Sequence, residues 1–131
     1  MKLNEFVHKW IGNKCDFDGA YGAQCVDLFR QYCKEVVGSP HTGAVEGAKD
    51  LWLKWNELPE ERKWFKRVRS PKEGDVMIWN STERNPYGHV AIMLSKLGDE
   101  YIVFEQDGFK QNGATISIRN KDNLLGGLRP L

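Results

Sequence analysis

The apolar residues of this chain change their spacing about halfway along it, and this change constrains the fold more than any other feature. In the first half they recur every three or four positions, which is typical of helices that pack by one face. The predicted helices cover 2–10, 25–37 and 44–56. In the second half, short apolar runs alternate with turn-forming residues, which is typical of strands. The predicted strands cover 75–79, 89–94, 101–104, 115–118 and 128–131. Helices followed by strands indicate an α+β fold, with N-terminal helices packed on an antiparallel sheet.

Three local features refine this prediction. The residues around Gly98 predict a hairpin turn between the second and third strands. Pro130 favours an edge position for the last strand, because proline is poorly tolerated in a central one. The basic stretch 62–69 surrounds two aromatic residues, and we expect it to form a solvated charged surface.

Composition narrows the class of protein. A length of 131 residues, with 40% apolar residues, predicts one folded domain over 1–131 and excludes global disorder. The balance of 19 Lys and Arg against 18 Asp and Glu argues against a nucleic-acid binder. The chain contains neither an apolar run of membrane-spanning length nor a signal peptide at Met1. Its three cysteines form no C-x-x-C pair, which argues against zinc and favours a reducing place of synthesis with a free thiol.

Cys25 opens the predicted helix 25–37. A thiol at a helix start lies among unpaired backbone N–H groups at the positive end of the helix dipole, and both favour the thiolate. A thiolate is the nucleophile of cysteine catalysis. Such catalysis also needs an imidazole that exchanges protons and a third group that orients the imidazole.

His89 is the candidate imidazole, because it stands at a loop-to-strand junction where active-site side chains are commonly held. A hairpin through Gly98 pairs the following strand antiparallel to the strand of His89. This pairing brings Glu105 and Asp107 back beside His89 as candidates for the third group. The alternatives are a structural histidine and an exposed acidic strand end.

The loop before Cys25 carries carboxylates at alternate positions, with another acidic residue shortly after them. This spacing is similar to that of an EF-hand-type calcium loop. Because carboxylates this close repel one another without a cation, we expect a calcium ion here. The expected ligands are Asp16, Asp18, Ala20, Gly22 and Asp27, of which Ala20 and Gly22 contribute backbone carbonyls. In the alternative interpretation the aspartates form turns and complement the helix dipole.

Four segments together match the pattern of a known family in order and spacing. They are Gln24-Cys25-Val26-Asp27, Pro71-Lys72-Glu73-Gly74-Asp75-Val76-Met77-Ile78-Trp79, Gly88-His89-Val90-Ala91-Ile92-Met93 and Phe104-Glu105-Gln106-Asp107. The chain resembles the CHAP family, the cysteine- and histidine-dependent amidohydrolase/peptidase domains of phage lysins and bacterial wall hydrolases. The resemblance extends from about residue 5 to the C-terminus. It implies a papain-like α+β fold and cleavage of amide bonds in peptidoglycan.

The resemblance also implies roles for single residues. Cys25 would be the nucleophile, His89 the general base and then general acid, and Glu105 the group that orients His89. Asp107 stands where many relatives have asparagine; an ionised aspartate cannot donate the amide hydrogen bond, although its carboxylate could orient His89. The backbone N–H of Cys25 and a neighbouring donor, for which Gln24 is the candidate, would hold the oxyanion.

The same family bears on the calcium prediction. Some phage-lysin relatives carry a calcium ion just ahead of the catalytic cysteine, on aspartates that match Asp16, Asp18 and Asp27. A later ligand in those relatives can be a histidine, which Gly22 replaces here.

The function expected from the resemblance is a peptidoglycan hydrolase that uses a Cys-His-Glu mechanism without an organic cofactor. An endopeptidase is favoured because calcium-bearing relatives often are endopeptidases. An N-acetylmuramoyl-L-alanine amidase with the same site is one alternative, and a non-catalytic calcium-dependent wall-binding module is another.

Further expectations concern partners and location. The expected partner is bacterial peptidoglycan rather than nucleic acid or membrane, and the chain is expected to be a monomer. It would be phage-encoded, made without a signal peptide, and would act on the bacterial wall. The length leaves no room for a separate wall-binding domain, so we expect either a fragment of a longer lysin or a protein that works with a partner.

Overall fold

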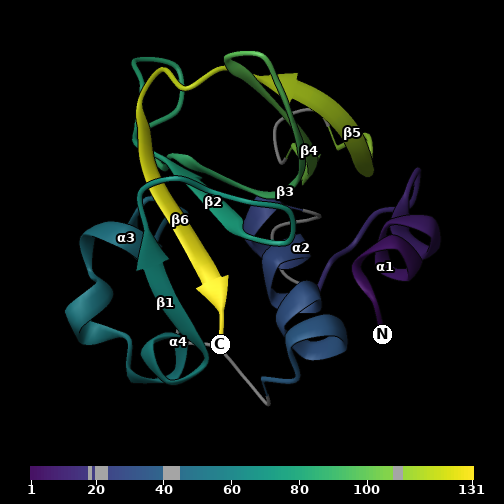
Figure 1. Ribbon diagram of the computed structural model, residues 1–131, viewed down its shortest axis with the longest axis horizontal. Coiled ribbons are helices and arrows are strands. Elements are labelled where there is room, and N and C mark those ends of the chain that lie inside the picture. The colour runs from purple at the N-terminus through teal and green to yellow at the C-terminus, as the bar shows by residue number, and fades with distance from the viewer. Residues whose placement is uncertain (18, 20–23, 40–44, 108–110) are drawn as a thin grey trace.

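The computed structural model describes residues 1–17, 19, 24–39, 45–107 and 111–131, and in this part of the chain the helices precede the strands (Figure 1). The helical elements are α1 (Leu3–Trp10), α2 (Cys25–Tyr32), the π-helical turn η1 (Cys33–Val37), α3 (Asp50–Leu53), the 3-10 turn η2 (Trp55–Glu57) and α4 (Pro59–Trp64). The strands are β1 (Phe65–Val68), β2 (Val76–Trp79), β3 (His89–Leu97), β4 (Glu100–Gln106), β5 (Ala114–Arg119) and β6 (Leu124–Pro130). The predicted α+β class is confirmed.

Helix α2 and the turn η1 together cover the predicted helix 25–37. They end at Gly38, whose φ of 90° is the left-handed conformation that glycine adopts readily at a helix end. The apolar face of α2 packs on β3 and β4 and is fully buried at Phe29 and Tyr32. Phe6 of α1 packs edge-on against Tyr32, with ring centroids 5.4 Å apart. This packing anchors α2, and with it the start of the helix, on the sheet.

The predicted helix 44–56 is shorter in the structure and divided in two. Residue 44 lies outside the described residues, and α3 and η2 occupy 50–53 and 55–57. Pro59 begins α4, and the residue before a proline avoids the helical conformation. Leu58 accordingly has φ −119° and ψ 77°, which ends η2 before α4. Lys54, with φ −107° and ψ 26°, separates α3 from η2. Ala48 and Leu51 are buried, as the apolar spacing predicts.

The described residues form a six-stranded sheet of order β1-β6-β2-β3-β4-β5, with antiparallel neighbours throughout. The prediction of an edge position for the last strand is wrong, because β6 lies between β1 and β2. Strand β1 comes from the stretch predicted to be only a charged surface: Phe65 points into the core, while Lys66 and Arg67 are exposed. Pro130 is tolerated because it pairs with Phe65 at the very end of the ladder.

The middle of the sheet is buried on both faces. One face packs on the helices through residues such as Ile78 and Ile92. The other face carries a second cluster that includes Trp79, Met93 and Val103. At one end of this region Trp79 of β2 pairs with the first residue of β3, and the hydrogen-bond register with β6 shifts at the same place. None of the described helices combines the length and hydropathy needed to cross a membrane.

Candidate active site

Cys25 is the first residue of α2, and its side chain is partly exposed. Gln24 caps the helix, and its backbone N–H donates to Oδ2 of Asp27 at 2.9 Å. Asp27 is 4% exposed, so this buried carboxylate fixes the turn that presents Cys25. The thiol therefore stands at the positive end of a short, well-anchored helix.

The other two cysteines differ from Cys25 in their surroundings. Cys15 and Cys33 are each 1% exposed and unpaired. Burial raises the pKa of Cys15 to about 12, with help from the nearby Asp27 carboxylate. Burial likewise raises the pKa of Cys33 far above its ordinary value. Both buried thiols stay protonated at neutral pH and are unsuited to nucleophilic attack.

His89 stands at the start of β3, between Cys25 and Glu105. Its Nε2 lies 3.0 Å from Oε1 of Glu105, and its side chain is also in hydrogen-bonding contact with the Cys25 thiol. The pairing of β3 with β4 across the turn at Gly98 produces this approach. The predicted proximity of His89 and Glu105 is confirmed.

Two opposing influences set the charge state of His89. Burial disfavours the imidazolium, but the hydrogen bonds with Cys25 and Glu105 outweigh it and raise the pKa of His89 to about 9. Burial similarly opposes ionisation of Glu105, yet the hydrogen bonds from His89 and Arg119 hold its pKa at about 2. At neutral pH the carboxylate is ionised and stabilises a positive imidazole. His89 is therefore placed to hold a proton beside Cys25 and to pass it on.

Arg119 is a member of the site that the sequence pattern did not reveal. From the end of β5 its Nε donates to Oε1 of Glu105, and its Nη2 donates to Oε2 at 3.1 Å. Its guanidinium also lies 5.7 Å from the ring centre of Trp79. One signal could have found it: Glu105 pairs with Thr115, and period-two alternation places Arg119 on the same face of β5 as Thr115. A bidentate arginine pair holds a carboxylate in a defined plane, so Arg119 restrains Glu105.

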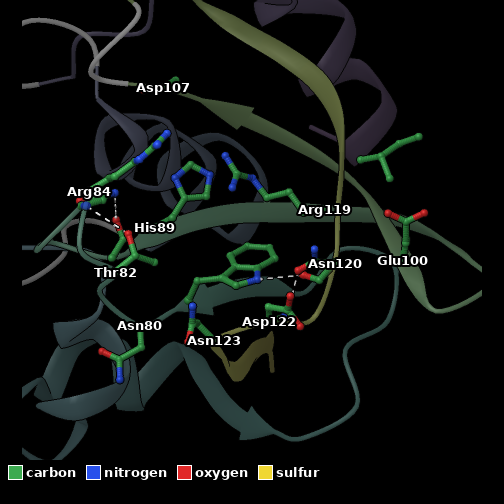
Figure 2. Close-up of a pocket in the computed structure, with 14 residues that line it drawn as sticks. Asn80, Thr82, Arg84, His89, Glu100, Asp107, Arg119, Asn120, Asp122 and Asn123 are labelled. Atoms are coloured by element: carbon green, nitrogen blue, oxygen red, sulfur yellow. Dashed lines mark hydrogen bonds between the residues drawn. The ribbon is translucent and has the colours of Figure 1, made fainter.

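A polar pocket of about 440 Å³ opens beside His89 (Figure 2). Its walls come from β2, β3, β5 and the loops beside them and include Trp79, Asn80, His89, Asp107, Arg119 and Asn123. The Trp79 ring lies 5.8 Å from the imidazole ring and donates its Nε1–H to the Asn120 carbonyl. Amide groups and an aromatic face beside a candidate base are suited to a polar, peptide-like ligand.

Asp107 follows the end of β4 and is half-buried at the edge of this pocket. Figure 2 shows it apart from the His89 ring, whose Nε2 is bonded by Glu105. A role for Asp107 in orienting His89 therefore stays a prediction, and so does a role for Gln24 in holding an oxyanion.

The predicted calcium ligands lie only partly within the described residues. Asp18, Ala20 and Gly22 lie outside them. Asp16 is exposed, and Asp27 accepts the Gln24 N–H at the start of α2. The residues that the structure describes contain no group of three or more acidic, histidine or cysteine side chains able to hold a metal.

Several known proteins resemble this chain in sequence. A family model described as CHAP domain matches residues 14–107. The D-alanyl-L-alanine endopeptidase of Streptococcus phage B30 is 35% identical over 113 residues, which cover 84% of this chain and 25% of that protein. Endolysin PlyTW of Staphylococcus phage Twort is 28% identical over 143 residues, which cover 98% of this chain and 29% of that protein. The chain thus spans less than a third of the length of these curated relatives.

Solved structures of other proteins have the same fold as this chain. The structure of Ly7917 with the hydrolyzing product of MDP matches this chain with a TM-score of 0.71 and 19% sequence identity. The match covers 99% of this chain and 63% of the Ly7917 chain. The wild-type endolysin LysIME-EF1 has a TM-score of 0.67 at 24% identity, covering 99% of this chain and 64% of that chain.

Proposed function

Because this chain belongs to the CHAP family of amidohydrolases and peptidases, we propose that it is a catalytic domain that hydrolyses amide bonds of bacterial peptidoglycan. The observation that carries the proposal is a series of contacts from Cys25 through His89 to Glu105. In the last of them, Nε2 of His89 lies 3.0 Å from Oε1 of Glu105. These three residues come from a helix start and two strands far apart in sequence. Cysteine hydrolysis requires such a nucleophile, base and orienting group.

In this mechanism the Cys25 sulfur attacks the carbonyl carbon of the scissile amide while His89 holds the thiol proton. The tetrahedral oxyanion accepts a hydrogen bond from the backbone N–H of Cys25, and Gln24 is the proposed second donor. His89 then gives its proton to the leaving nitrogen, the C–N bond breaks, and a thioester remains on Cys25. His89 next takes a proton from water, the hydroxide attacks the thioester, and the acid is released as the thiol reforms. Glu105 stabilises the imidazolium whenever His89 holds the proton.

The test of catalysis is clearing of suspended bacterial walls by the parent protein, Cys25→Ala and Cys33→Ala. We expect clearing by the parent and by Cys33→Ala, because burial keeps the Cys33 thiol protonated and unable to attack. Cys25→Ala should leave the walls uncleared, because it lacks the nucleophile. Equal clearing by the parent and Cys25→Ala would refute the mechanism. Wall binding by a parent protein that clears nothing would instead favour a non-catalytic wall-binding module.

We propose an endopeptidase rather than an N-acetylmuramoyl-L-alanine amidase. The support is a relative at 35% identity that is named a D-alanyl-L-alanine endopeptidase. Mass spectrometry of digested walls distinguishes the two activities. A new alanine or glycine amino terminus supports the endopeptidase, whereas free lactyl-muramic ends would identify the amidase.

We also propose that a calcium ion binds the segment before α2 and the first turn of α2, on Asp16, Asp18 and Asp27 with the carbonyls of Ala20 and Gly22. Carboxylate and carbonyl oxygens suit this hard cation, and Asp27 stands at the helix start that such an ion would stiffen. The ion would act by positioning Cys25. Calcium should raise the melting temperature, and Asp18→Ala should abolish the rise. A melting temperature that is the same with EDTA and with added calcium would contradict the proposal.

The proposed place of action is the bacterial wall, as a module of a phage lysin. The curated relatives come from phages of Streptococcus and Staphylococcus, and one of them is named an endolysin. This chain matches only part of the length of these relatives. We therefore propose that a further segment or a partner protein attaches it to the wall.

A further inference from the structure

Two consecutive residues of β4 point to opposite faces of the strand. Glu105 contacts His89 on one face. Gln106 points to the other face, toward the chain that leads into α2. Gln106 is 0% exposed, which is rare for a glutamine and demands that its polar atoms be satisfied within the protein.

The Gln106 carboxamide makes three short hydrogen bonds. Its Oε1 accepts the backbone N–H of Cys15 at 2.7 Å. Its Nε2 donates to the Cys15 carbonyl at 2.7 Å and to the Gln24 carbonyl at 2.8 Å. The second and third bonds use both hydrogens of the amide nitrogen. A single side chain therefore joins the two ends of the segment between Cys15 and Gln24.

Gln24 is the residue that connects this clamp to the nucleophile. It caps α2 immediately before Cys25, and its carbonyl also accepts the N–H of Asp27 at 3.1 Å. The bond from Gln106 thus restrains the peptide unit that joins Gln24 to Cys25. Strand β4 holds His89 through Glu105 and the start of α2 through Gln106, so it sets the separation of the two reacting side chains.

We propose that Gln106 is a positioning residue, which holds the N-cap of α2 and thereby places the Cys25 sulfur against His89. The role rests on the proposed function, because it matters only if Cys25 is the nucleophile. Without the carboxamide, the N–H of Cys15 and two carbonyls lose their buried partners, and the segment must move to recover hydrogen bonds. A nucleophile misplaced by about 1 Å loses about a hundredfold in rate.

The test compares Gln106→Met with Tyr32→Phe as a matched control. Methionine fills the volume of glutamine without its polar atoms. Tyr32→Phe removes another side-chain hydrogen bond, a partly buried one from Oη to the Gly74 carbonyl at 2.8 Å, at the far end of α2 from Cys25. Two rates are measured across pH: alkylation of Cys25 by iodoacetamide, and turnover of a defined peptidoglycan fragment, with kcat and KM determined separately.

We expect Gln106→Met to lower kcat by about tenfold to a hundredfold with little change in KM, and to slow and reshape the pH profile of Cys25 alkylation. Tyr32→Phe should leave both rates unchanged. A folded Gln106→Met that stays within about twofold of the parent in both rates would overturn the proposal. Equal losses in the two variants would also overturn it, since they would reveal a general effect on stability.

Gln106→Glu is the second variant, for use if Gln106→Met does not fold. It keeps the size of the side chain and the acceptor for Cys15, but replaces the donor that faces the Gln24 carbonyl. The same loss of both rates is expected, and parent-like rates would contradict the role. Slowed alkylation in the variants, beside a parent protein that cleaves no wall peptide, would support the positioning role while refuting the proposed function.

Discussion

Replacing Glu105 by glutamine tests the electrostatics of the site, because the change removes a charge and keeps the size. Burial alone would raise the pKa of Glu105, but hydrogen bonds from His89 and Arg119 lower it from 4.5 to about 2. A difference of one pH unit between the folded and unfolded pKa corresponds to about 1.4 kcal/mol, so the ionised carboxylate contributes about 3 kcal/mol to the free energy of unfolding. Its side chain is only 7% exposed, so water screens little of this interaction.

The sign of the pH dependence follows from the direction of each shift. An acid with a lowered pKa stabilises the fold above its unfolded value, so the contribution of Glu105 is lost as the pH falls from 4.5 to about 2. The pKa of His89 is raised from 6.5 to about 9, so its contribution is complete below 6.5 and is lost as the pH rises to about 9. The contact between the two side chains contributes to both shifts. The pair stabilises the fold most between pH 4.5 and 6.5.

Urea unfolding of the parent and Glu105→Gln across this range measures the effect. We expect a loss of about 3 kcal/mol at about pH 5.5, which shrinks toward pH 2 and toward pH 9. Glu100→Gln is the control, because it makes the same change at an exposed position of the same strand. A loss for Glu105→Gln that is equal at every pH, or no larger than that of Glu100→Gln, would refute the reasoning.

Three shorter predictions concern neighbouring groups. Arg119→Met should lower kcat by about tenfold, because Glu105 loses its bidentate partner and His89 its restraint; steady-state kinetics that match the parent would count against this role. Iodoacetamide should alkylate only one thiol of the native protein, that of Cys25, because the other two thiols are buried. Intact-mass spectra with two or three adducts would contradict this prediction. Gly88→Ala should destabilise the fold by about 1–3 kcal/mol in thermal unfolding, since φ is +77° and the new Cβ would lie 2.5 Å from the Trp79 carbonyl. An unchanged melting temperature would show that the loop adapts.

Some features of the candidate site could be predicted from the sequence because they depend on local spacing. The helix that starts at Cys25 follows from its apolar stripe and its stop at Gly38. The approach of Glu105 to His89 follows from a short hairpin, in which turn position and strand period determine which residues face each other. The family resemblance rests on the same short motifs, and the match over 14–107 confirms it.

Other features depend on pairings between distant segments, which local periodicity does not specify. A charged stretch forms β1, because the strand buries Phe65 in the core while Lys66 and Arg67 stay exposed. Its pairing with β6 makes β6 an internal strand. Arg119 joins Glu105 only because β5 pairs with β4 in one register.

The sequence by itself determined the local elements that carry the candidate residues: the helix start at Cys25 and the hairpin that brings Glu105 near His89. Only the tertiary structure decided how these parts are held together: Arg119 against Glu105, and Gln106 against Cys15, 91 positions away in the chain. The physical reason is that a buried polar side chain must find a partner wherever the fold brings one. That partner is selected by the packing of the whole domain rather than by its neighbours in sequence.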